Sequence, residues 1–292
     1  MRKILITGAN GLLGSYLLKT AKEQDQVRGF YNAHPCPGLS HSLDIREGRA
    51  VDIAFDWNPS VVIHCAGESR VDYAEKNPDE AADLNILGTH NLLAAADSVG
   101  CHFVYISSNA VYKGDAPPYT EESEQDPVNY YGRTKMQCEE LLSVYPHQAT
   151  IIRPIFLYGW TGQQIRKNLD TRILEALNKG EEQRVATDII TQPTYAADCA
   201  KAIWSLIELQ DKRVDSFNVG SNAKVSLYDF ARAVAYSFGH DPSMILPAHS
   251  SEFTTFAPRP KDTSFDTSKI EGMGIKMDGH VEGLARMKKE LK

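Results

Sequence analysis

Tyr131 and Lys135 form a pair of side chains suited to proton transfer. They lie four residues apart in Tyr131-Gly132-Arg133-Thr134-Lys135, so on a helix both project from one face. An ammonium group beside a phenol stabilises the phenolate form, which would let Tyr131 exchange a proton with a substrate oxygen near neutral pH. Taken alone, such a spacing more often marks an exposed surface pair.

A serine pair strengthens this interpretation. Ser107 and Ser108 follow an apolar run that predicts a strand, and ligands of doubly wound sheets gather at the carboxyl ends of strands. A hydroxyl at that edge can polarise the carbonyl group that Tyr131 would protonate. Lys135 could also hold the ribose of a nicotinamide cofactor. The three residue types therefore indicate acid catalysis on a carbonyl.

A glycine-rich loop, Gly8-Ala9-Asn10-Gly11-Leu12-Leu13-Gly14, opens the chain after an apolar run at Lys3–Thr7. Its spacing is G-x-x-G-x-x-G, which departs from the G-x-G-x-x-G form. Glycines between a strand and a helix let backbone N–H groups approach a pyrophosphate, and the helix N-terminus adds partial positive charge. We therefore predict a dinucleotide site that includes Gly8 to Gly14, Ala9 excepted.

The residues after the second strand favour NADP, with NAD as the alternative. A site that prefers NAD places an acid about 20 residues after the glycines, but no acid lies between Asp25 and Asp44. Arg28 or His34 could attract a 2′-phosphate instead, although a solvated strand residue explains Arg28 equally well. Asp44 and its neighbour Ile45 are assigned to the cofactor site, where Asp44 would contact adenine or cap the next helix.

The elements that must position these residues alternate between strands and helices. The predicted strands are Lys3–Thr7, Gln26–Tyr31, Val61–Ala66, Phe103–Ser107, Thr150–Arg153 and Ser216–Val219. The predicted helices are Leu12–Glu23, Pro78–Val99, Tyr130–Val144 and Ala197–Leu209. Runs rich in Val and Ile suit parallel strands buried on both faces. The sequence thus predicts an α/β fold with a doubly wound parallel sheet of the Rossmann type.

Beyond residue 155 the pattern loosens and predicts a second, smaller domain. Residues 1–155 and 191–220 are assigned to the dinucleotide-binding domain. Residues 156–190 and 221–292 are assigned to an interleaved, C-terminal substrate-binding domain. At 292 residues the chain is long enough for both units.

Composition limits the partners. The net charge is −7, which argues against nucleic acid, because phosphate neutralisation needs a basic face. No stretch approaches the roughly 18 apolar residues of a membrane helix, and the five cysteines show no zinc or disulfide spacing. His64 lies in an apolar run and predicts a core histidine, and no metal site is expected. The chain is expected to be cytoplasmic.

Together these motifs resemble the extended short-chain dehydrogenase/reductase family. The resemblance runs nearly end to end through the glycine loop, His64-Cys65-Ala66-Gly67, Leu84–Thr89, Ser107–Tyr112, the Tyr131/Lys135 pair and Arg153–Gly159. It implies that Ser108, Tyr131 and Lys135 form a catalytic triad. It further implies that Cys65, Ala66, Gly67 and Pro154 line the cofactor and that Asn85 supports the lysine.

Within that family the chain resembles the dTDP-4-dehydrorhamnose reductase branch, and also the regulatory β subunit of methionine adenosyltransferase. The marks are Pro117–Glu121, Gln192–Tyr195, Arg259-Pro260 and Ser264–Asp266. This likeness implies an NAD(P)H-dependent reductase of a nucleotide-linked 4-keto-6-deoxy sugar. A sugar-nucleotide 4-epimerase with tightly bound NAD and a non-catalytic NADP-binding regulatory subunit remain as alternatives. Homodimerisation is left open.

The residues after the catalytic serine depart from related enzymes. Dehydratases of the family carry Asp-Glu there, whereas this chain has Asn109 and Ala110, so dehydration is disfavoured. Asn109 is assigned to the substrate site with Ser108 and Tyr131. Arg259 would grip the nucleotide diphosphate through paired hydrogen bonds. Weaker diphosphate candidates are Arg166, Lys167 and Arg172.

Overall fold

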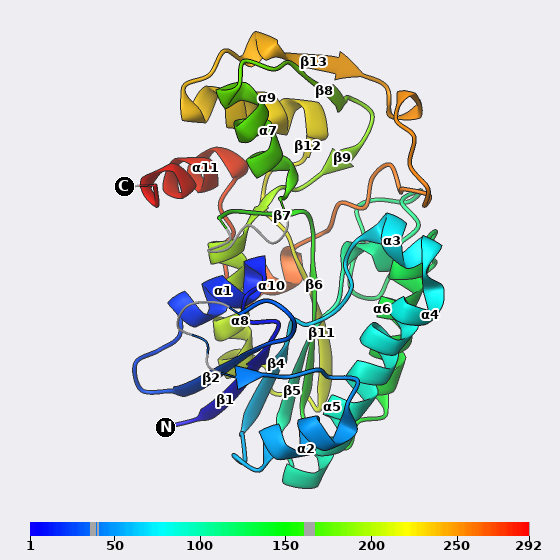
Figure 1. The fold of residues 1–292 in the computed structure, drawn as a ribbon, viewed down its shortest axis with the longest axis vertical. Coiled ribbons are helices and arrows are strands. Elements are labelled where there is room, and N and C mark those ends of the chain that lie inside the picture. The colour runs from blue at the N-terminus through cyan, green and yellow to red at the C-terminus, as the bar shows by residue number, and fades with distance from the viewer. Residues whose placement is uncertain (36–38, 40, 161–166, 292) are drawn as a thin grey trace.

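The computed structural model describes residues 1–35, 39, 41–160 and 167–291. Within this part of the chain a seven-stranded sheet has the order β11-β6-β5-β4-β1-β2-β3, with every pairing parallel (Figure 1). The strands are β1 (Lys3–Thr7), β2 (Gln26–Tyr31), β3 (His41–Ser42), β4 (Val61–His64), β5 (His102–Ile106), β6 (Ala149–Pro154) and β11 (Val214–Val219). The chain winds outward from β1 in one direction and from β4 in the other. This is the predicted doubly wound sheet, with its switch point between β1 and β4.

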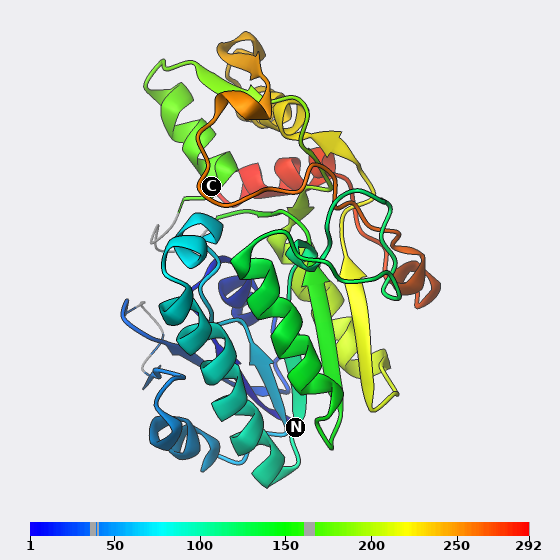
Figure 2. The same cartoon turned by 90° about the vertical axis from the view of Figure 1, so that its right-hand side faces the viewer.

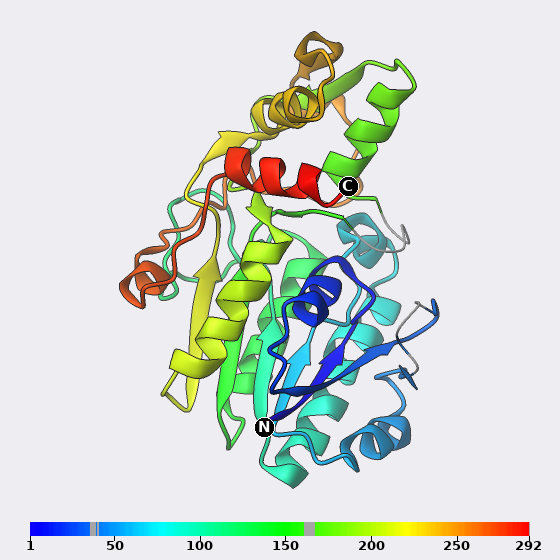
Figure 3. The ribbon, with the colours of Figure 1, turned by 90° about the vertical axis from the view of Figure 1, so that its left-hand side faces the viewer.

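Successive side chains along the strands point to opposite faces of the sheet and pack into two apolar cores, one on each face. Ile4 and Ile6 of β1 belong to the core under α1 and α8, whereas Leu5 belongs to the core under α2, α5 and α6. The first pair is α1 (Leu12–Lys19) and α8 (Ala196–Leu209), and the second group is α2 (Gly48–Phe55), α5 (Gly88–Val99) and α6 (Tyr130–Ser143). Figure 2 faces the side of α5 and α6, and Figure 3 faces α1 and α8. Burial on both faces explains why the strand sequences are continuously apolar.

The predicted strands agree with the structure to within two residues at each end, and β1 and β2 agree at both ends. The first helix is shorter than predicted: it ends at Lys19, whereas the prediction extended it to Glu23. The Thr20 hydroxyl donates a hydrogen bond to the carbonyl oxygen of Tyr16 at 2.7 Å. A side chain that takes over a helix carbonyl in this way competes with the next turn of the helix.

The predicted helix over Pro78–Val99 contains a break in its regular winding. It consists of α4 (Pro78–Ala82), a π-helical turn η1 (Asp83–Leu87) and α5, and it follows the short helix α3 (Val71–Lys76). Inside η1 the carbonyl oxygen of Asn85 accepts hydrogen bonds from Thr89 Oγ1 at 2.5 Å and from Cys138 Sγ at 3.2 Å. Single π turns of this kind are frequent at functional sites.

A smaller layer covers the carboxyl edge of the sheet (Figure 1). Its helices are α7 (Leu169–Asn178), α9 (Leu227–Phe238) and α11 (His280–Lys289), and its strand pairs are β7 (Leu157–Tyr158) with β10 (Thr194–Tyr195), β8 (Gln183–Ala186) with β13 (Ile245–Ala248), and β9 (Ile190–Thr191) with β12 (Val225–Ser226). Short helices complete the chain at η2 (Asn109–Val111), η3 (Pro242–Met244), η4 (Ser250–Glu252) and α10 (Ser268–Gly272). On this arrangement we propose the division into residues 1–155 and 191–220, and residues 156–190 and 221–292. Helix α10 belongs to the second group in sequence but packs against β11, whereas β10 belongs to the first group in sequence but pairs with β7 of the smaller layer.

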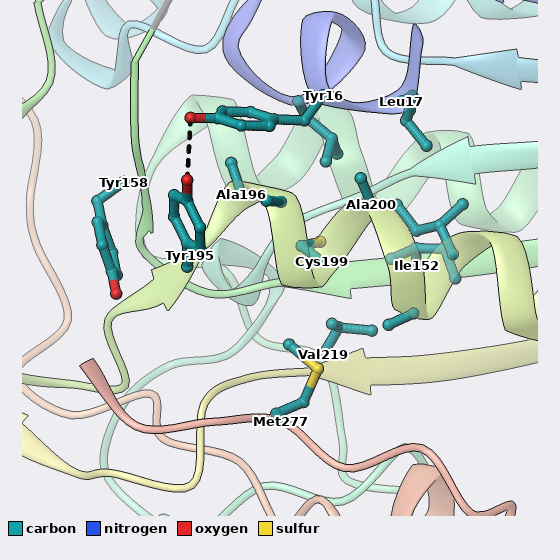
Figure 4. Close-up of a cluster of buried hydrophobic side chains, with 14 of the residues drawn as sticks. Tyr16, Leu17, Ile152, Tyr158, Tyr195, Ala196, Cys199, Ala200, Val219 and Met277 are labelled. Atoms are coloured by element: carbon teal, nitrogen blue, oxygen red, sulfur yellow. Dashed lines mark hydrogen bonds between the residues drawn. The ribbon is translucent and has the colours of Figure 1, made fainter. Parts of the chain in front are cut away.

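Aromatic side chains join the two layers. Tyr16 of α1 and Tyr195 of β10 meet edge to face, with hydroxyl oxygens 3.5 Å apart (Figure 4). Tyr158 stacks beside Tyr195 with ring centroids 5.5 Å apart. Figure 4 shows the apolar core continuing from these rings along α8 through Ala196, Cys199 and Ala200. The smaller layer is thereby fixed to the sheet beside the start of α1.

Candidate active site

The glycine loop lies against the loop that follows β4 so closely that side chains are excluded. Gly8 has a φ of +62°, and a Cβ there would lie 2.7 Å from the nitrogen of Ala66. A Cβ on Gly14 would lie 2.3 Å from the carbonyl oxygen of Gly8. Gly11 caps the N-terminus of α1 and offers no side-chain partner to its N–H groups. The first turn of α1 is thus open to an anionic ligand.

One cavity of about 1420 Å³ joins this loop to the smaller layer. Of the residues assigned from the sequence, those that line it are Gly8, Asn10, Gly11, Leu12, Leu13, Gly14, Ile45, Cys65, Ala66, Gly67, Ser108, Asn109, Tyr131, Lys135, Pro154 and Arg259. Most of them come from the carboxyl ends of the strands and the segments that follow directly, whereas Tyr131 and Lys135 come from α6 and Arg259 comes from the loop between η4 and α10. A cavity of this size exceeds the range usual for a single small ligand. It has room for a dinucleotide and a second ligand.

Arg28 and Asp44 were assigned to the cofactor but do not line the cavity. The Arg28 guanidinium lies over the ring of Trp57, 4.3 Å from its centroid. Asp44 accepts a paired hydrogen bond from Arg46 and a further one from the Arg46 backbone at 3.0 Å. The pairing with Arg46 lowers the pKa of Asp44. His34 contributes its backbone, since its carbonyl oxygen accepts from Asn10 Nδ2 at 2.9 Å.

Asn85 lies beneath the cavity rather than in its wall. Its side chain accepts from the nitrogen of Glu68 at 2.7 Å and donates to Glu68 O and to Thr134 Oγ1. A Cβ on Gly67 would come within 2.9 Å of Asn85 Oδ1. Asn85 therefore joins the loop after β4 to the residue that precedes Lys135.

Helix α6 carries Tyr131 and Lys135 and is held in close contact with η2. Its N-cap residue Asn129 accepts from Gly132 N at 2.9 Å. Tyr131 and Lys135 are buried, with 9% and 7% of their surface exposed. Lys135 Nζ donates to the carbonyl oxygen of Ile106 at 2.8 Å and lies 5.9 Å from the centroid of the Tyr131 ring. The ammonium group is thereby held at the end of β5, near the ring of Tyr131.

Ser108 lies between the strand end and η2. Its Oγ accepts from Ala110 N at 3.1 Å and donates to Asn109 Oδ1 at 3.3 Å. Asn109 Nδ2 then donates to Thr263 Oγ1 at 2.5 Å. Asn109 thus ties the serine to the loop from the smaller layer. With Tyr131 and Lys135 in the same cavity wall, the arrangement offers one proton donor, one cation and one hydroxyl to a carbonyl oxygen.

Arg259 closes the cavity from the smaller layer. Its Nη2 lies 3.1 Å from Asp72 Oδ1, which also accepts from Ala257 N at 2.9 Å. Arg259 Nη1 is buried and has no partner among the described residues. A buried guanidinium donor without an acceptor suits an anionic ligand. Lys167 and Arg172 also line the cavity, and Arg166 lies outside the described residues.

Burial sets the charge states beside the glycine loop. Desolvation lowers the pKa of His64 to about 3, and the charge of Lys135 acts in the same direction. Desolvation raises the pKa of the Cys65 thiol to about 12, although Lys135 opposes it. His64 is 1% exposed and is a core histidine, as predicted. Across the described ranges, no cluster of three or more His, Cys, Asp or Glu side chains could hold a metal ion, and no helix is long and apolar enough to cross a membrane.

Several residues of the site were missed from the sequence. Phe253 and Thr263 line the cavity, and Thr7 joins its floor to His64. Thr263 acts through a contact with a segment more than 150 residues away, for which the sequence carries no signal. Thr7, in contrast, ends one predicted strand, and His64 lies two residues before the end of the predicted strand Val61–Ala66, at the end of the observed β4. Their position at the ends of neighbouring parallel strands was a signal that could have paired them.

Comparison with known proteins places these features in a family. The model of the RmlD substrate binding domain matches residues 1–292. Methionine adenosyltransferase 2 subunit beta of Rattus norvegicus is 31% identical over 285 residues, which cover 94% of this chain and 83% of that protein. The spore coat polysaccharide biosynthesis protein SpsK of Bacillus subtilis is 30% identical over 279 residues, with coverage of 94% and 93%.

A solved structure extends the likeness to the whole fold. The dTDP-4-dehydrorhamnose reductase of Bacillus anthracis, solved in complex with NADP, matches with a TM-score of 0.88 and 30% identity over 99% of each chain. The resemblance expected from the motifs is thereby confirmed. The chain belongs to the RmlD substrate binding domain family.

Proposed function

We propose that this protein is an NADPH-dependent reductase of a nucleotide-linked 4-keto-6-deoxy sugar. The observation that carries the proposal is one cavity that holds the glycine loop at one end, Arg259 at the other, and Ser108, Tyr131 and Lys135 between them. An open helix N-terminus suits a pyrophosphate, and the buried, unpartnered Nη1 of the Arg259 guanidinium suits a second diphosphate. The catalytic side chains would then face the sugar where the two ligands meet.

The chain fits a bound dinucleotide. The glycines leave a cradle that a Cβ on Gly8 or Gly14 would fill, and the first turn of α1 has no side-chain cap. The residues that would hold the cofactor are Gly8, Asn10, Gly11, Leu12, Leu13, Gly14, Ile45, Cys65, Ala66, Gly67 and Pro154. NADPH, when bound, supplies a hydride to the carbonyl carbon of the sugar. The relative from Bacillus anthracis, solved with NADP, supports this choice of cofactor.

The side chains would act on the carbonyl oxygen. Tyr131 donates its phenolic proton to that oxygen as negative charge develops there. Ser108 donates a hydrogen bond to the same oxygen, which stabilises the charge before the proton arrives. Lys135, held by the carbonyl of Ile106, stabilises the phenolate that Tyr131 becomes. The wall contains Asn109 and Ala110 where dehydratases of the family carry an acid and a base, so it offers no groups for eliminating water from the keto sugar.

NADPH oxidation with a 4-keto-6-deoxy sugar nucleotide tests this proposal. We expect turnover in the native protein and a loss of at least about a thousandfold in Tyr131→Phe, with NADPH binding retained. Tyr130→Phe is the matched control, because Tyr130 lies next to the acid but outside the cavity lining. Retained turnover in Tyr131→Phe would overturn the assigned acid.

A regulatory role is the second candidate, and the likeness to methionine adenosyltransferase 2 subunit beta favours it. In that case NADPH would bind but no 4-keto sugar nucleotide would be reduced, and a methionine adenosyltransferase catalytic subunit would co-purify. A 4-epimerase would instead retain tightly bound NAD on purification and act without added cofactor. Absorbance of the purified protein and a cofactor-free assay separate these outcomes.

A further inference from the structure

His64 connects the two halves of the candidate site. It ends β4, is 1% exposed, and pairs in register with Thr7 at the end of β1. Both ring nitrogens are used, since Nδ1 lies 2.8 Å from Thr7 Oγ1 and Nε2 lies 3.0 Å from Thr89 Oγ1. The ring therefore connects β1 with α5 beside the switch point of the sheet.

Counting hydrogens fixes the direction of each hydrogen bond. The Thr89 hydroxyl donates its single proton to the carbonyl oxygen of Asn85. Its oxygen must therefore accept the hydrogen bond from His64 Nε2–H. Thr7 Oγ1 accepts from Ala66 N–H at 3.2 Å and donates its own proton to His64 Nδ1. A neutral ring protonated at Nε2 satisfies the whole chain. Burial keeps the ring neutral by lowering its pKa to about 3.

The Thr7 end of this chain belongs to the glycine loop. Thr7 precedes Gly8, and its hydroxyl holds the nitrogen of Ala66, the same atom that limits the space at Gly8. The spacing between the two loops thus depends on where His64 Nδ1 holds the Thr7 hydroxyl. These loops form the cradle proposed for the cofactor pyrophosphate.

The Thr89 end of this chain lies on α5 and leads to α6, the helix that carries Tyr131 and Lys135. Thr89 binds the carbonyl oxygen that the π turn presents at Asn85. The Asn85 side chain fixes the backbone of Glu68 and donates to Thr134, the neighbour of Lys135. A displacement of Thr89 would therefore shift Asn85, and with it Thr134 and the neighbouring Lys135.

We infer that His64 is a positioning residue, which sets the glycine loop through Thr7 and the Lys135 region through Thr89. The inference rests on the proposed reductase function for its turnover readout. A histidine with a purely structural role would change stability and leave the kinetic constants of the folded protein unchanged.

Two substitutions of His64 each keep one of its two hydrogen bonds, to Thr7 or to Thr89, and remove the other. An Asn carbonyl oxygen replaces Nδ1 and accepts from Thr7 but does not reach Thr89, whereas a Gln amide replaces Nε2 and donates to Thr89 but leaves Thr7 without its acceptor. For His64→Asn we expect an unchanged Kd for NADPH and a kcat lowered about tenfold. For His64→Gln we expect the Kd raised about tenfold and the kcat within about twofold.

Further variants keep the test decisive if His64 variants fold poorly. Thr89→Val keeps the shape but removes the hydrogen bond to His64 Nε2, so it should lower kcat and leave the Kd unchanged. Thr89→Ser keeps the hydroxyl and should retain the native kcat. His102→Gln is the control for loss of a buried histidine outside the cavity. Equal changes in Kd and kcat across all variants, or changes in melting temperature alone, would overturn the inference.

Failure of the proposed function leaves a different pattern. If the native protein binds NADPH but reduces no 4-keto sugar nucleotide, the reductase proposal fails. The inference is then judged on Kd alone: weaker binding confined to His64→Gln supports it, and equal binding in both His64 variants overturns it.

Discussion

Gly132 of α6 lies directly against the carbonyl oxygen of Ala110 in η2, and a Cβ on Gly132 would come within 2.1 Å of that oxygen. The contact is between backbones, so no rotamer change can relieve an added methyl group. It joins the helix that carries Tyr131 and Lys135 to the turn that follows Ser108. The distance between the proposed acid and the serine therefore depends on this glycine.

Gly132→Ala should separate α6 from η2 and misplace Tyr131. We expect turnover to fall at least about a hundredfold, because displacements near 1 Å have such effects. The free energy of unfolding should also fall by about 1–3 kcal/mol from overpacking. Gly272→Ala is the control, since a Cβ there meets nothing within 4 Å. Steady-state kinetics and denaturant unfolding check both effects, and full activity in Gly132→Ala would contradict the assigned geometry.

Arg28→Ala should leave the KM for NADPH within about twofold of the native value. The guanidinium lies over Trp57 rather than in the cavity, and loss of this cation–π contact should cost about 0.5–1 kcal/mol of stability. Initial rates over a range of NADPH and NADH concentrations measure the effect. A tenfold increase in KM for NADPH alone would instead return Arg28 to the 2′-phosphate site.

The contrast between Arg28 and the rest of the site shows which site residues could be predicted from the sequence and which could not. The ends of strands could be predicted, because apolar runs stop where the chain enters the cleft, and this placed Ser108 and Gly67. Arg28 was assigned by its distance along the chain, but side chains alternate along a strand. Arg28 pairs in register with Leu5 and lies on the same face of the sheet as Phe30. That face packs against α2, on the side of the sheet opposite to α1.

Contacts between distant segments could not be predicted. The Asp72–Arg259 and Asn109–Thr263 pairs depend on where the smaller layer settles on the sheet, which no local pattern encodes. The π turn at Asn85 was equally hidden. Its sequence has ordinary helical periodicity, and only the tertiary partners Thr134 and Cys138 distinguish it.

Arg259→Ala should raise the KM for the sugar nucleotide by about 10- to 100-fold, with little effect on the KM for NADPH. The expected size is that of a lost hydrogen bond to a charged group. Arg259→Lys should recover part of the loss, because a lysine keeps the charge but not the planar fork. Arg49→Ala, on the exposed surface of α2, controls for net charge. An equal rise in both KM values would place Arg259 outside the substrate site.

His102 should make stability depend on acid pH. Burial lowers its pKa to about 4 in the folded state, whereas the unfolded state binds a proton near the ordinary value of 6.5. Between these values only the unfolded state binds the proton, so stability falls as pH falls. His102→Gln should reduce that slope by up to about 1.4 kcal/mol per pH unit. Urea unfolding of the native protein and of His102→Gln at several pH values measures it, and equal slopes in the two proteins would contradict the prediction.

Glu290 should hold the C-terminal helix α11 on the sheet domain. Its carboxylate accepts hydrogen bonds from Tyr16 Oη at 2.9 Å and from Tyr195 Oη, and Tyr16 also accepts from Trp160 N. Burial raises the pKa of Tyr16 to about 12, so its hydroxyl remains a donor at neutral pH. Both rings are in the interlayer contact of Figure 4.

Glu290→Ala removes the acceptor shared by the two hydroxyls and should lower the free energy of unfolding by about 1–2 kcal/mol. Trypsin should then cut sooner at the lysines near the end of α11, because the helix detaches more often. Glu282→Ala removes an exposed carboxylate from the first turn of the same helix and should change neither measurement. If both variants lose equal stability, net charge on α11 rather than the tyrosine contact would hold the helix in place.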